Sequence, residues 1–251
     1  MPIQVTYPEP GLALVTVSNP SCRNALGVLE FTTLATAWGD IARERSVRCV
    51  IVTGEGELAF CSGAQMNEDF SVVTDINDLV DRALLKTCVY PLPLVAAING
   101  HCVAGGFELM LACDVRVASS HARLGLPEVH WGIVPSGGGA MKLVEQIGYA
   151  RAMRLLLSGE LVSADEALKV GIVNEVVPAS DLMARALSIA RVIASNSPLA
   201  VAHTKQMALA GRSHAWTERE ADERKRANLV RSSADALVGR QAFFDKKAPI
   251  Y

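Results

Sequence analysis

The chain has 251 residues, of which 50% are hydrophobic, and its formal net charge at pH 7 is −2. This length can bury a large core, as one large domain or as one domain with a small appendage. This charge balance gives no sign of the excess positive charge that is typical of a nucleic-acid-binding protein. The basic run Arg224-Lys225-Arg226 alternates with acidic residues, as on a solvated helix face, so we expect no nucleic-acid partner.

The sequence also argues against a secreted or membrane protein. Six cysteines show no C-x-x-C spacing, and several lie in apolar runs, which fits a reducing compartment and a cytoplasmic protein. The N-terminus lacks a basic region followed by an apolar one, so we expect no secretory signal. Residues 87–107 carry no charge, but their prolines and glycines favour a buried strand and a turn over a membrane span.

Short β-branched runs alternate with helical patterns along the first 177 residues. The runs that predict strands are residues 12–17, 49–53, 94–98, 115–118 and 172–177. Residues 25–41 and 76–87 have the periodicity of helices. This alternation predicts an α/β chain whose strands are covered on both faces rather than solvated.

Strand signals end near Ser180, and the rest of the chain is predicted to be helical. The expected helices are residues 182–194, 198–210 and 217–231. Ser195-Asn196-Ser197-Pro198 supplies polar caps and a proline that can open a helix. We therefore predict a core at residues 1–195 and a separate helical region at residues 196–251, to which the family resemblance described below adds a role in oligomerisation.

Two glutamates, Glu108 and Glu128, stand beside glycine-bearing turns in otherwise apolar stretches. A lone helical glutamate is usually a solvated surface residue, but Glu108 is the only charge between positions 103 and 113. Two carboxylates that face one cavity repel each other, which raises one pKa and leaves one proton donor and one acceptor near neutral pH. The pair predicts acid/base chemistry.

Two further turns, at residues 60–66 and 104–106, consist largely of small residues. Small residues let backbone N–H groups approach a ligand, and two such groups can form an oxyanion hole. Gly105 precedes a helical pattern, so the positive end of a helix dipole would add to the stabilisation of negative charge there.

Together these segments closely resemble the crotonase (enoyl-CoA hydratase/isomerase) superfamily. The resemblance is carried by the following segments: Phe60-Cys61-Ser62-Gly63-Ala64, residues 99–109 with Ala112-Cys113-Asp114, Gly125-Leu126-Pro127-Glu128 and residues 132–138. It implies an α/β fold, a spiral of repeated ββα turns, with a C-terminal helical region that builds trimers or dimers of trimers.

The resemblance implies a coenzyme A thioester as the substrate and no separate cofactor. The N–H groups of Ala64 and Gly105 match the family's oxyanion pair, and Glu108 and Glu128 match the two catalytic glutamates of its hydratases. No metal cluster occurs among the histidines, and hydration needs no metal or redox group. We assign Glu108 to the water and Glu128 to the proton at Cα, although the two can share both tasks.

Contacts with coenzyme A also follow from the resemblance. The matching positions are Arg23, Ala25, Ala64, Gln65, Met66, Asn67, Phe243 and Lys246. Gln65 stands where the family usually has aspartate, and residues 139–142 replace the common Gly-Thr-Gln-Arg, which leaves the substrate preference open.

The sequence thus predicts hydration of a 2-enoyl-CoA to a 3-hydroxyacyl-CoA. Two alternatives remain: a double-bond isomerase that uses Glu128 alone, and a non-catalytic scaffold that binds coenzyme A. The presence of both glutamates disfavours each of them.

Overall fold

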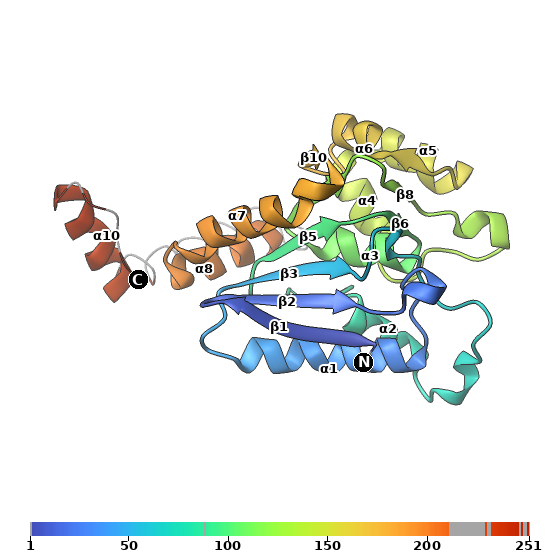
Figure 1. Ribbon diagram of the computed structural model, residues 1–251, viewed down its shortest axis with the longest axis horizontal. Coiled ribbons are helices and arrows are strands. Elements are labelled where there is room, and N and C mark those ends of the chain that lie inside the picture. Colours follow the sequence, from blue (N-terminus) through green and yellow to red (C-terminus); the bar gives the residue numbers. More distant parts are fainter. Residues whose placement is uncertain are drawn as a thin grey trace.

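A computed structural model describes residues 2–87, 89–210, 229, 232–245, 247 and 250. A six-stranded sheet crosses the molecule (Figure 1). Its spatial order is β1 (Ile3–Glu9), β2 (Leu12–Val17), β3 (Cys49–Gly54), β5 (Leu94–Ile98), β7 (Val115–Ser119) and β10 (Glu175–Val177). β1 pairs with β2 antiparallel, and every other neighbouring pair is parallel.

All five predicted strands lie in this sheet, but the fifth is shorter than expected. Its first residues, Ile172 and Val173, donate their N–H groups to the Ala167 carbonyl in the turn that follows α6 (Ala164–Val170). Both side chains are buried, so the β-branched pattern at these two residues reflects burial and not pairing in a strand.

Helices cover both faces of the sheet, as expected for parallel strands. On one face, α7 (Leu182–Ala194) packs Leu182, Ala186 and Ala190 against the strands. On the other face lies α1 (Val28–Arg43), whose buried residues include Phe31 and Trp38. The α/β class predicted from the sequence is confirmed.

A second sheet of four short strands adjoins the first. Its order is β4 (Ala59–Cys61), β6 (His101–Val103), β8 (Arg123–Gly125) and β9 (Val162–Ser163). Since β3, β5 and β7 are each followed by one of its strands, the chain repeats a ββ unit and then a helical segment, which is the expected spiral. These strands were not predicted from the sequence, because a strand of two or three residues is too short to show a periodic pattern.

The remaining helices of the core are α2 (Ile76–Ala83), α3 (Gly105–Ala112), α4 (Gly139–Ile147) and α5 (Tyr149–Ser158). Short 3-10 turns are η1 (Pro20–Cys22), η2 (Phe70–Val72), η3 (Glu128–Trp131) and η4 (Ala179–Asp181). α2 ends earlier than predicted, and Leu85 just beyond it adopts a left-handed φ of 51° that no helix continues.

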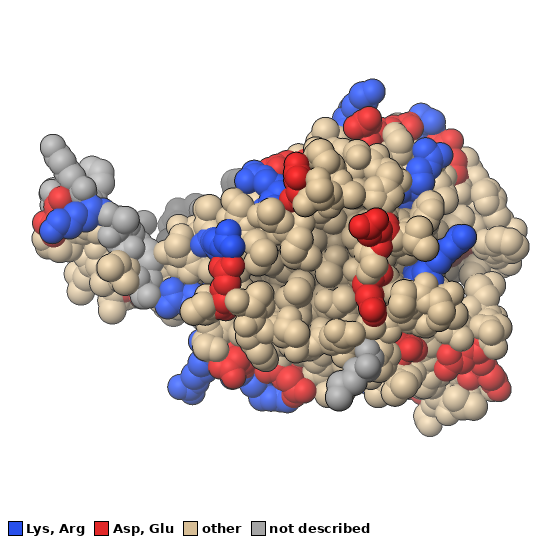
Figure 2. Space-filling model, viewed as in Figure 1, with Lys and Arg blue, Asp and Glu red and all other residues tan. Residues whose placement is uncertain are grey.

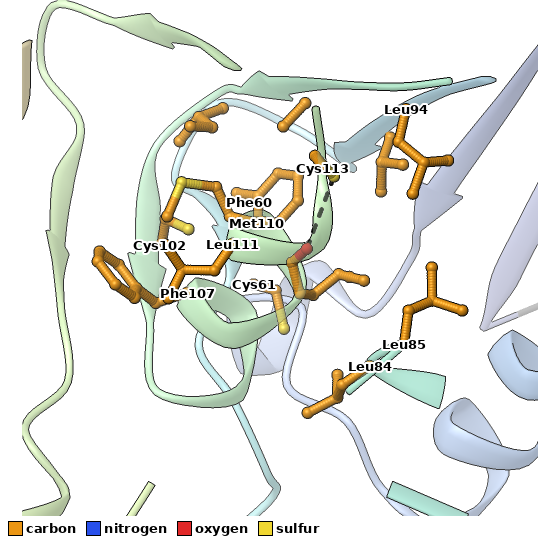
Figure 3. Packing of buried hydrophobic residues seen from close by; sticks show 14 of the residues in the cluster. Phe60, Cys61, Leu84, Leu85, Leu94, Cys102, Phe107, Met110, Leu111 and Cys113 are labelled. Atoms are coloured by element: carbon orange, nitrogen blue, oxygen red, sulfur yellow. Dashed lines mark hydrogen bonds between the residues drawn. The ribbon is translucent and has the colours of Figure 1, made fainter. Parts of the chain in front are cut away.

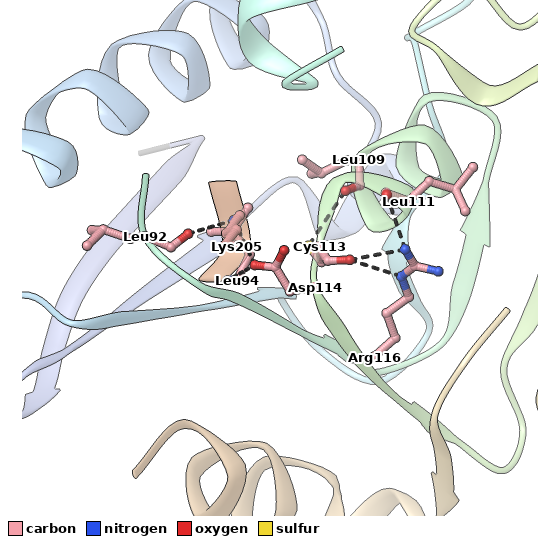
Figure 4. Close-up of polar contacts among 8 residues, drawn as sticks. All are labelled: Leu92, Leu94, Leu109, Leu111, Cys113, Asp114, Arg116 and Lys205. Carbon is pink, nitrogen blue, oxygen red and sulfur yellow. Dashed lines mark hydrogen bonds and ion pairs between the residues drawn. The ribbon is translucent and has the colours of Figure 1, made fainter. Parts of the chain in front are cut away.

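Polar side chains fix the junction between α3 and β7 (Figure 4). Arg116 is buried and donates to the carbonyls of Leu111 and Cys113 at the C-terminal end of α3, where a cation suits the helix dipole. Asp114 accepts from the Leu94 N–H at 2.7 Å and from Lys205 Nζ at 2.7 Å. Lys205 belongs to α8 (Pro198–Ala210), so this contact holds the first tail helix against the sheet.

The predicted cap and start of α8 are confirmed, since Ser197 Oγ accepts the Ala200 N–H and Pro198 is the first helical residue. The last helix, α10 (Ala234–Asp245), lies apart from the sheets in Figure 1. The expected helix at 217–231, which includes the basic run at 224–226, lies outside the described residues except for position 229. No helix in the described part is long and apolar enough to cross a membrane.

Five cysteines are described, and all have free thiols. Cys22 is exposed, whereas Cys49, Cys61, Cys102 and Cys113 are buried. Burial raises the pKa of Cys49, Cys61 and Cys113 to about 12, and it raises the pKa of Cys102 well above the usual range. Figure 3 shows three of them in the packing around α3. There they act as small hydrophobic side chains.

Candidate active site

Two turns meet at the end of the small sheet. One follows β4 and contains Gly63 and Ala64, and the other follows β6 and contains Ala104 and Gly105. Leu26 holds the first turn, because its N–H donates to the Gly63 carbonyl and its own carbonyl accepts the Gln65 N–H. The sequence predicted a helix from residue 25, and this bridge explains why α1 begins only at Val28.

Glycine is required where the turns approach each other. A Cβ on Gly106 would overlap the Cys61 carbonyl oxygen, and a Cβ on Gly63 would lie 2.9 Å from the Gly105 nitrogen. Gly63 also has a φ of +89°, which side-chain-bearing residues rarely adopt. Ala104 adopts a φ of 51° despite its side chain, a strained conformation of the kind that clusters at functional sites.

The turns bring the N–H groups of Ala64 and Gly105 together. The Ala64 nitrogen lies 3.8 Å from the position that a Cβ on Gly105 would occupy. Gly105 is the first residue of α3, so its N–H has no intrahelical acceptor and points outward from the positive end of the helix dipole. Two converging donors can stabilise an anionic oxygen.

Glu108 lies in the first turn of α3, a helix whose other residues are apolar and almost all buried. Figure 3 shows three other residues of this helix, Phe107, Met110 and Leu111, within the hydrophobic packing. The Glu108 side chain is itself buried, and its Oε1 accepts the Gly139 N–H at 2.8 Å. Burial raises the pKa of Glu108, while the N–H groups of Gly139 and Gly137 and the charges of two lysines partly oppose this shift.

Two glycines, Gly137 and Gly139, lie against the Glu108 carboxylate. A Cβ on Gly137 would lie 2.6 Å from Glu108 Oε2, and a Cβ on Gly139 would lie 3.0 Å from Oε1. Gly138 between them has a φ of +99°. Glycine at these positions therefore lets the backbone approach the carboxylate closely enough to donate hydrogen bonds.

Glu128 opens η3, directly after Pro127. Burial raises its pKa to about 7; its own backbone N–H opposes that shift, and the negative charge of Glu108 adds to it. Among the described residues, Glu128 Oε2 has no hydrogen-bond partner. The adjacent His130 is tied down, because its Nε2 donates to the Ser158 carbonyl at 2.7 Å. The segment is thus anchored, and one carboxylate oxygen of Glu128 is buried without a partner in the described part of the chain.

Both glutamates and both N–H groups line one cavity of about 320 Å³. Its lining comes from α1, α2, the two turns and the segment after β8. The lining residues besides Ala64, Gly105, Glu108 and Glu128 are Phe31, Ser62, Met66, Phe70, Ile76, Val80, Leu84, Val103, Ala104, Pro127, Trp131, Ile133, Val134 and Ser136. The four predicted catalytic positions are therefore brought together in a mostly apolar cavity.

Most of the predicted coenzyme A contacts lie beside this cavity. The Asn19 amide nitrogen connects two of these positions, because it donates to the Ala25 carbonyl at 3.2 Å and lies 3.5 Å from the Gln65 side-chain oxygen. Arg23 has a left-handed φ of 54° and is exposed, whereas Ala25 is buried.

The other four predicted contacts differ in position. Met66 is exposed and lines the cavity, and Asn67 is exposed beside it. Phe243 lies in α10, where its side chain is not described, and Lys246 lies outside the described residues. The apolar cavity wall was not foreseen from the sequence, because its side chains come from separate elements that only the fold unites.

A larger cavity of about 540 Å³ lies near Gly138 and contains neither glutamate. It is lined by charged side chains, among them Lys86, Lys142 and Arg116. These groups serve the fold: Arg116 donates to backbone carbonyls, and Lys142 Nζ donates to the Leu85 carbonyl at 2.8 Å. No group of three or more histidine, cysteine or acidic side chains able to hold a metal occurs in the described ranges.

Comparison with known proteins gives consistent matches along the chain. Residues 8–251 match a family model described as enoyl-CoA hydratase/isomerase. A short-chain-enoyl-CoA hydratase of Clostridium acetobutylicum is 38% identical over 79% of this chain and 77% of its own length. The 2,3-dehydroadipyl-CoA hydratase of Escherichia coli (strain K12) is 33% identical over 94% of this chain and 93% of its own.

Solved structures agree with these matches. The crystal structure of an enoyl-CoA hydratase from Bacillus anthracis is similar with a TM-score of 0.95 at 34% identity, covering 100% of this chain and 99% of that one. A structure from Mycobacterium abscessus, titled as an enoyl-CoA hydratase/isomerase, has a TM-score of 0.91 at 34% identity, with coverage of 100% and 99%.

Proposed function

The chain belongs to the enoyl-CoA hydratase/isomerase family, and from that premise we propose that it hydrates a 2-enoyl-CoA thioester to the 3-hydroxyacyl-CoA. The observation that carries the proposal is the convergence of two buried carboxylates and two backbone donors on one cavity. The raised pKa of Glu128, to about 7, suits a group that must hold a proton near neutral pH.

The thioester carbonyl oxygen occupies the space between the N–H groups of Ala64 and Gly105. As water attacks C3, the π electrons of the C2=C3 bond move toward C2 and the carbonyl oxygen, which becomes enolate-like. The two donors stabilise this charge more than they stabilise the neutral thioester, so they lower the barrier.

Two proton transfers complete the addition. Glu108, whose ionised form is favoured by the N–H groups of Gly137 and Gly139, accepts a proton from the attacking water. Protonated Glu128 donates its proton to C2. The carboxyls end with exchanged protonation states, and proton exchange with solvent or between them restores the resting form. These steps need no metal or redox group. Coenzyme A enters as part of the substrate and not as a separate cofactor.

We also propose that coenzyme A lies along Arg23, Ala25 and residues 64–67, with Phe243 and Lys246 as further contacts. The chain is proposed to assemble as a trimer or a dimer of trimers. Support comes from α10, which lies apart from the sheets and exposes Leu237 and Val238. Sedimentation tests the assembly, and a chain truncated before Pro198 should aggregate or become monomeric.

A second candidate is double-bond isomerisation by Glu128 alone. The observation in its favour is that Glu128 Oε2 has no partner among the described residues, so one carboxyl could carry a proton between C2 and C4. Isomerisation by Glu128 alone gives no role to Glu108 or to the glycines that lie against its carboxylate. We therefore place this reaction second.

Crotonyl-CoA and a 3-enoyl-CoA distinguish the two reactions. Hydration removes the absorbance of the conjugated thioester of crotonyl-CoA, whereas isomerisation of a 3-enoyl-CoA creates it. Loss of absorbance with formation of 3-hydroxybutyryl-CoA supports the proposal. Gain of absorbance from the 3-enoyl-CoA, without hydration of crotonyl-CoA, would establish the isomerase instead.

A further inference from the structure

We infer that the cavity accepts uncharged acyl groups and discriminates against acyl groups that end in a second carboxylate. This inference rests on the proposed function and specifies its substrate class. It matters because one relative, at 33% identity, is named for a 2,3-dehydroadipyl group, which is dicarboxylic. Family membership alone therefore leaves the charge of the acyl group open.

The lining of the cavity supplies no positive charge in the part of the chain that the structure describes. Its only ionisable side chains are Glu108 and Glu128, and its other polar side chains are two serines. Phe31, Phe70 and Leu84 form part of its apolar wall, with Phe31 and Phe70 packed edge to face at 6.1 Å between ring centroids. A carboxylate against this wall would lose hydration without gaining a partner, which costs several kcal/mol.

Two lysines whose charges act on Glu108 are engaged elsewhere. Lys86 pairs with Asp81 at 3.1 Å, and Lys142 Nζ donates to the Leu85 carbonyl. Both lysines line the larger cavity, and both lie close to the position that a Cβ on Gly138 would occupy. They are thus on the other side of the glycine run from the acyl cavity. Arg82 of α2 pairs with Asp78 at 2.8 Å on the exposed face of that helix.

The outer face of the cavity wall is acidic. The segment that contributes Phe70, Ile76 and Val80 to the lining runs through residues 68–82. It contains five carboxylates and one arginine, and they are Glu68, Asp69, Asp75, Asp78, Asp81 and Arg82. Figure 2 shows acidic side chains gathered at the lower right, over the teal loop that lies near α2 in Figure 1. A second carboxylate on the substrate would approach a surface of its own sign.

The size of the cavity strengthens the discrimination. A volume of about 320 Å³ is close to the lower end of the roughly 300–1,000 Å³ that small-molecule sites span. The reacting thioester occupies part of it. Little room remains to carry water along with a terminal carboxylate, so the charge would contact the lining directly.

The test uses two substrates of equal chain length, 2-hexenoyl-CoA and 2,3-dehydroadipyl-CoA, which differ in a terminal methyl or carboxylate. Hydration by the full chain is followed as kcat/KM. We expect a preference for 2-hexenoyl-CoA of about a hundredfold or more, since an unpaired charge is rejected far more strongly than a missing methyl group. A preference below about tenfold, or for the dicarboxylic substrate, overturns the inference.

Binding without turnover separates this inference from the proposed reaction. The saturated analogues hexanoyl-CoA and adipyl-CoA are compared by calorimetry, and we expect the dissociation constant of adipyl-CoA to be at least about tenfold larger. If neither enoyl substrate reacts but this ratio holds, the hydratase proposal fails and the apolar-pocket inference stands. If both enoyl substrates react equally, the reverse is true.

Introduced cations provide a gain-of-function test. Val80→Lys places an ammonium on the α2 face of the cavity, and Val134→Arg places a guanidinium on the opposite, exposed segment, where folding is not at risk. Each is compared with the uncharged Val80→Met or Val134→Met. Relative to these controls, at least one cationic variant should shift the kcat/KM ratio toward 2,3-dehydroadipyl-CoA by about tenfold or more. No shift in either folded variant counts against the inference.

Discussion

The carboxylates of Glu108 and Glu128 face the same cavity, and the charge of Glu108 is one of the causes that raise the pKa of Glu128 to about 7. Their surroundings differ. Glu108 accepts hydrogen bonds from backbone N–H groups, which favour its ionised form, whereas Glu128 has one oxygen without a partner among the described residues. This asymmetry favours Glu128 as the member of the pair that holds the proton.

We expect Glu108→Gln and Glu128→Gln each to lower kcat for crotonyl-CoA hydration by at least about a hundredfold, the usual scale for losing a general acid or base. Binding of the unreactive butyryl-CoA should change little, because the amide preserves the shape of each side chain. Turnover is measured by absorbance and binding by calorimetry. Near-normal turnover of either folded variant would remove that residue from the mechanism.

The pH dependence of kcat/KM should report the Glu128 proton. Since the pKa of Glu128 is raised to about 7, its protonated form is present below that pH and is lost above it. Hydration should therefore decline by about tenfold per pH unit on the alkaline side. The residual activity of Glu128→Gln should lack this decline. A rate that stays constant to pH 9 in the unmodified protein would contradict the assignment.

The same raised pKa makes folding stability depend on pH. Between the ordinary pKa of glutamate and about 7, the folded protein holds a proton on Glu128 that the unfolded chain has released, so stability falls as pH rises. Glu128→Gln removes this loss. We expect it to raise the free energy of unfolding by on the order of 1 kcal/mol at pH 8 and to change it little at pH 4, as measured by urea titration.

Glu108→Gln serves as a comparison for that measurement. Glu108 Oε1 accepts the Gly139 N–H and the Gly137 N–H also favours the ionised carboxyl, whereas an amide offers a single acceptor oxygen and no charge. We therefore expect it to destabilise the fold by about 1 kcal/mol. Equal effects of the two substitutions on stability would show that the surroundings of the carboxyls do not differ as described.

Gly105→Pro tests the donor at the start of α3. Proline is tolerated at the first position of a helix but carries no N–H, and the loss of one oxyanion donor costs about 3 kcal/mol, or ~10²–10³ in kcat. Gly105→Ala is the matched control, because it keeps the N–H and its Cβ would lie 3.4 Å from the Gly63 Cα. If the folded proline variant matched the alanine variant in kcat, the thioester could not lie between Ala64 and Gly105.

Gly137→Ala tests whether the glycine run positions Glu108. The added Cβ would lie 2.6 Å from Glu108 Oε2, so either the carboxylate or the loop must move. We expect kcat to decrease by about tenfold or more, since small displacements of reacting groups are costly. Gly148→Ala is the control: its Cβ would enter open space, and its φ of +82° makes alanine strained there without any contact with Glu108. It should cost about 1 kcal/mol of stability and leave kcat unchanged.

The fold was predictable where long-range packing and local pattern agree. Apolar runs such as residues 49–53 and 94–98 are strands because parallel pairing buries both of their faces. The antiparallel β1 was not predicted, since most of its residues are only partly buried or exposed and include Pro8. Where the chain serves the site, local pattern misleads: Ala25 and Leu26 have a helical period, yet Leu26 pairs with Ala64 instead.

Some positions that line the cavity were predictable from the sequence. An isolated charge in an apolar helix indicated Glu108, two small-residue turns indicated Ala64 and Gly105, and all three line the cavity. The cavity wall was not predictable, because Phe31, Val80 and Trp131 belong to three elements whose ordinary helical or turn patterns carry no sign of a ligand. The role of Gly137 and Gly139 was also missed, since glycine runs alone do not reveal which group approaches them.

The buried thiols give this chain an internal reporter of opening. Alkylating reagents attack the thiolate, and burial keeps Cys49, Cys61 and Cys113 protonated through the physiological range. Exposed Cys22 is modified directly, whereas the buried thiols around α3 react only after the surrounding structure opens. The mass gained over time in dilute iodoacetamide therefore measures the opening of the segment that holds Glu108. Because ligands stabilise the closed form by mass action, acyl-CoA binding becomes measurable as slower alkylation without any turnover.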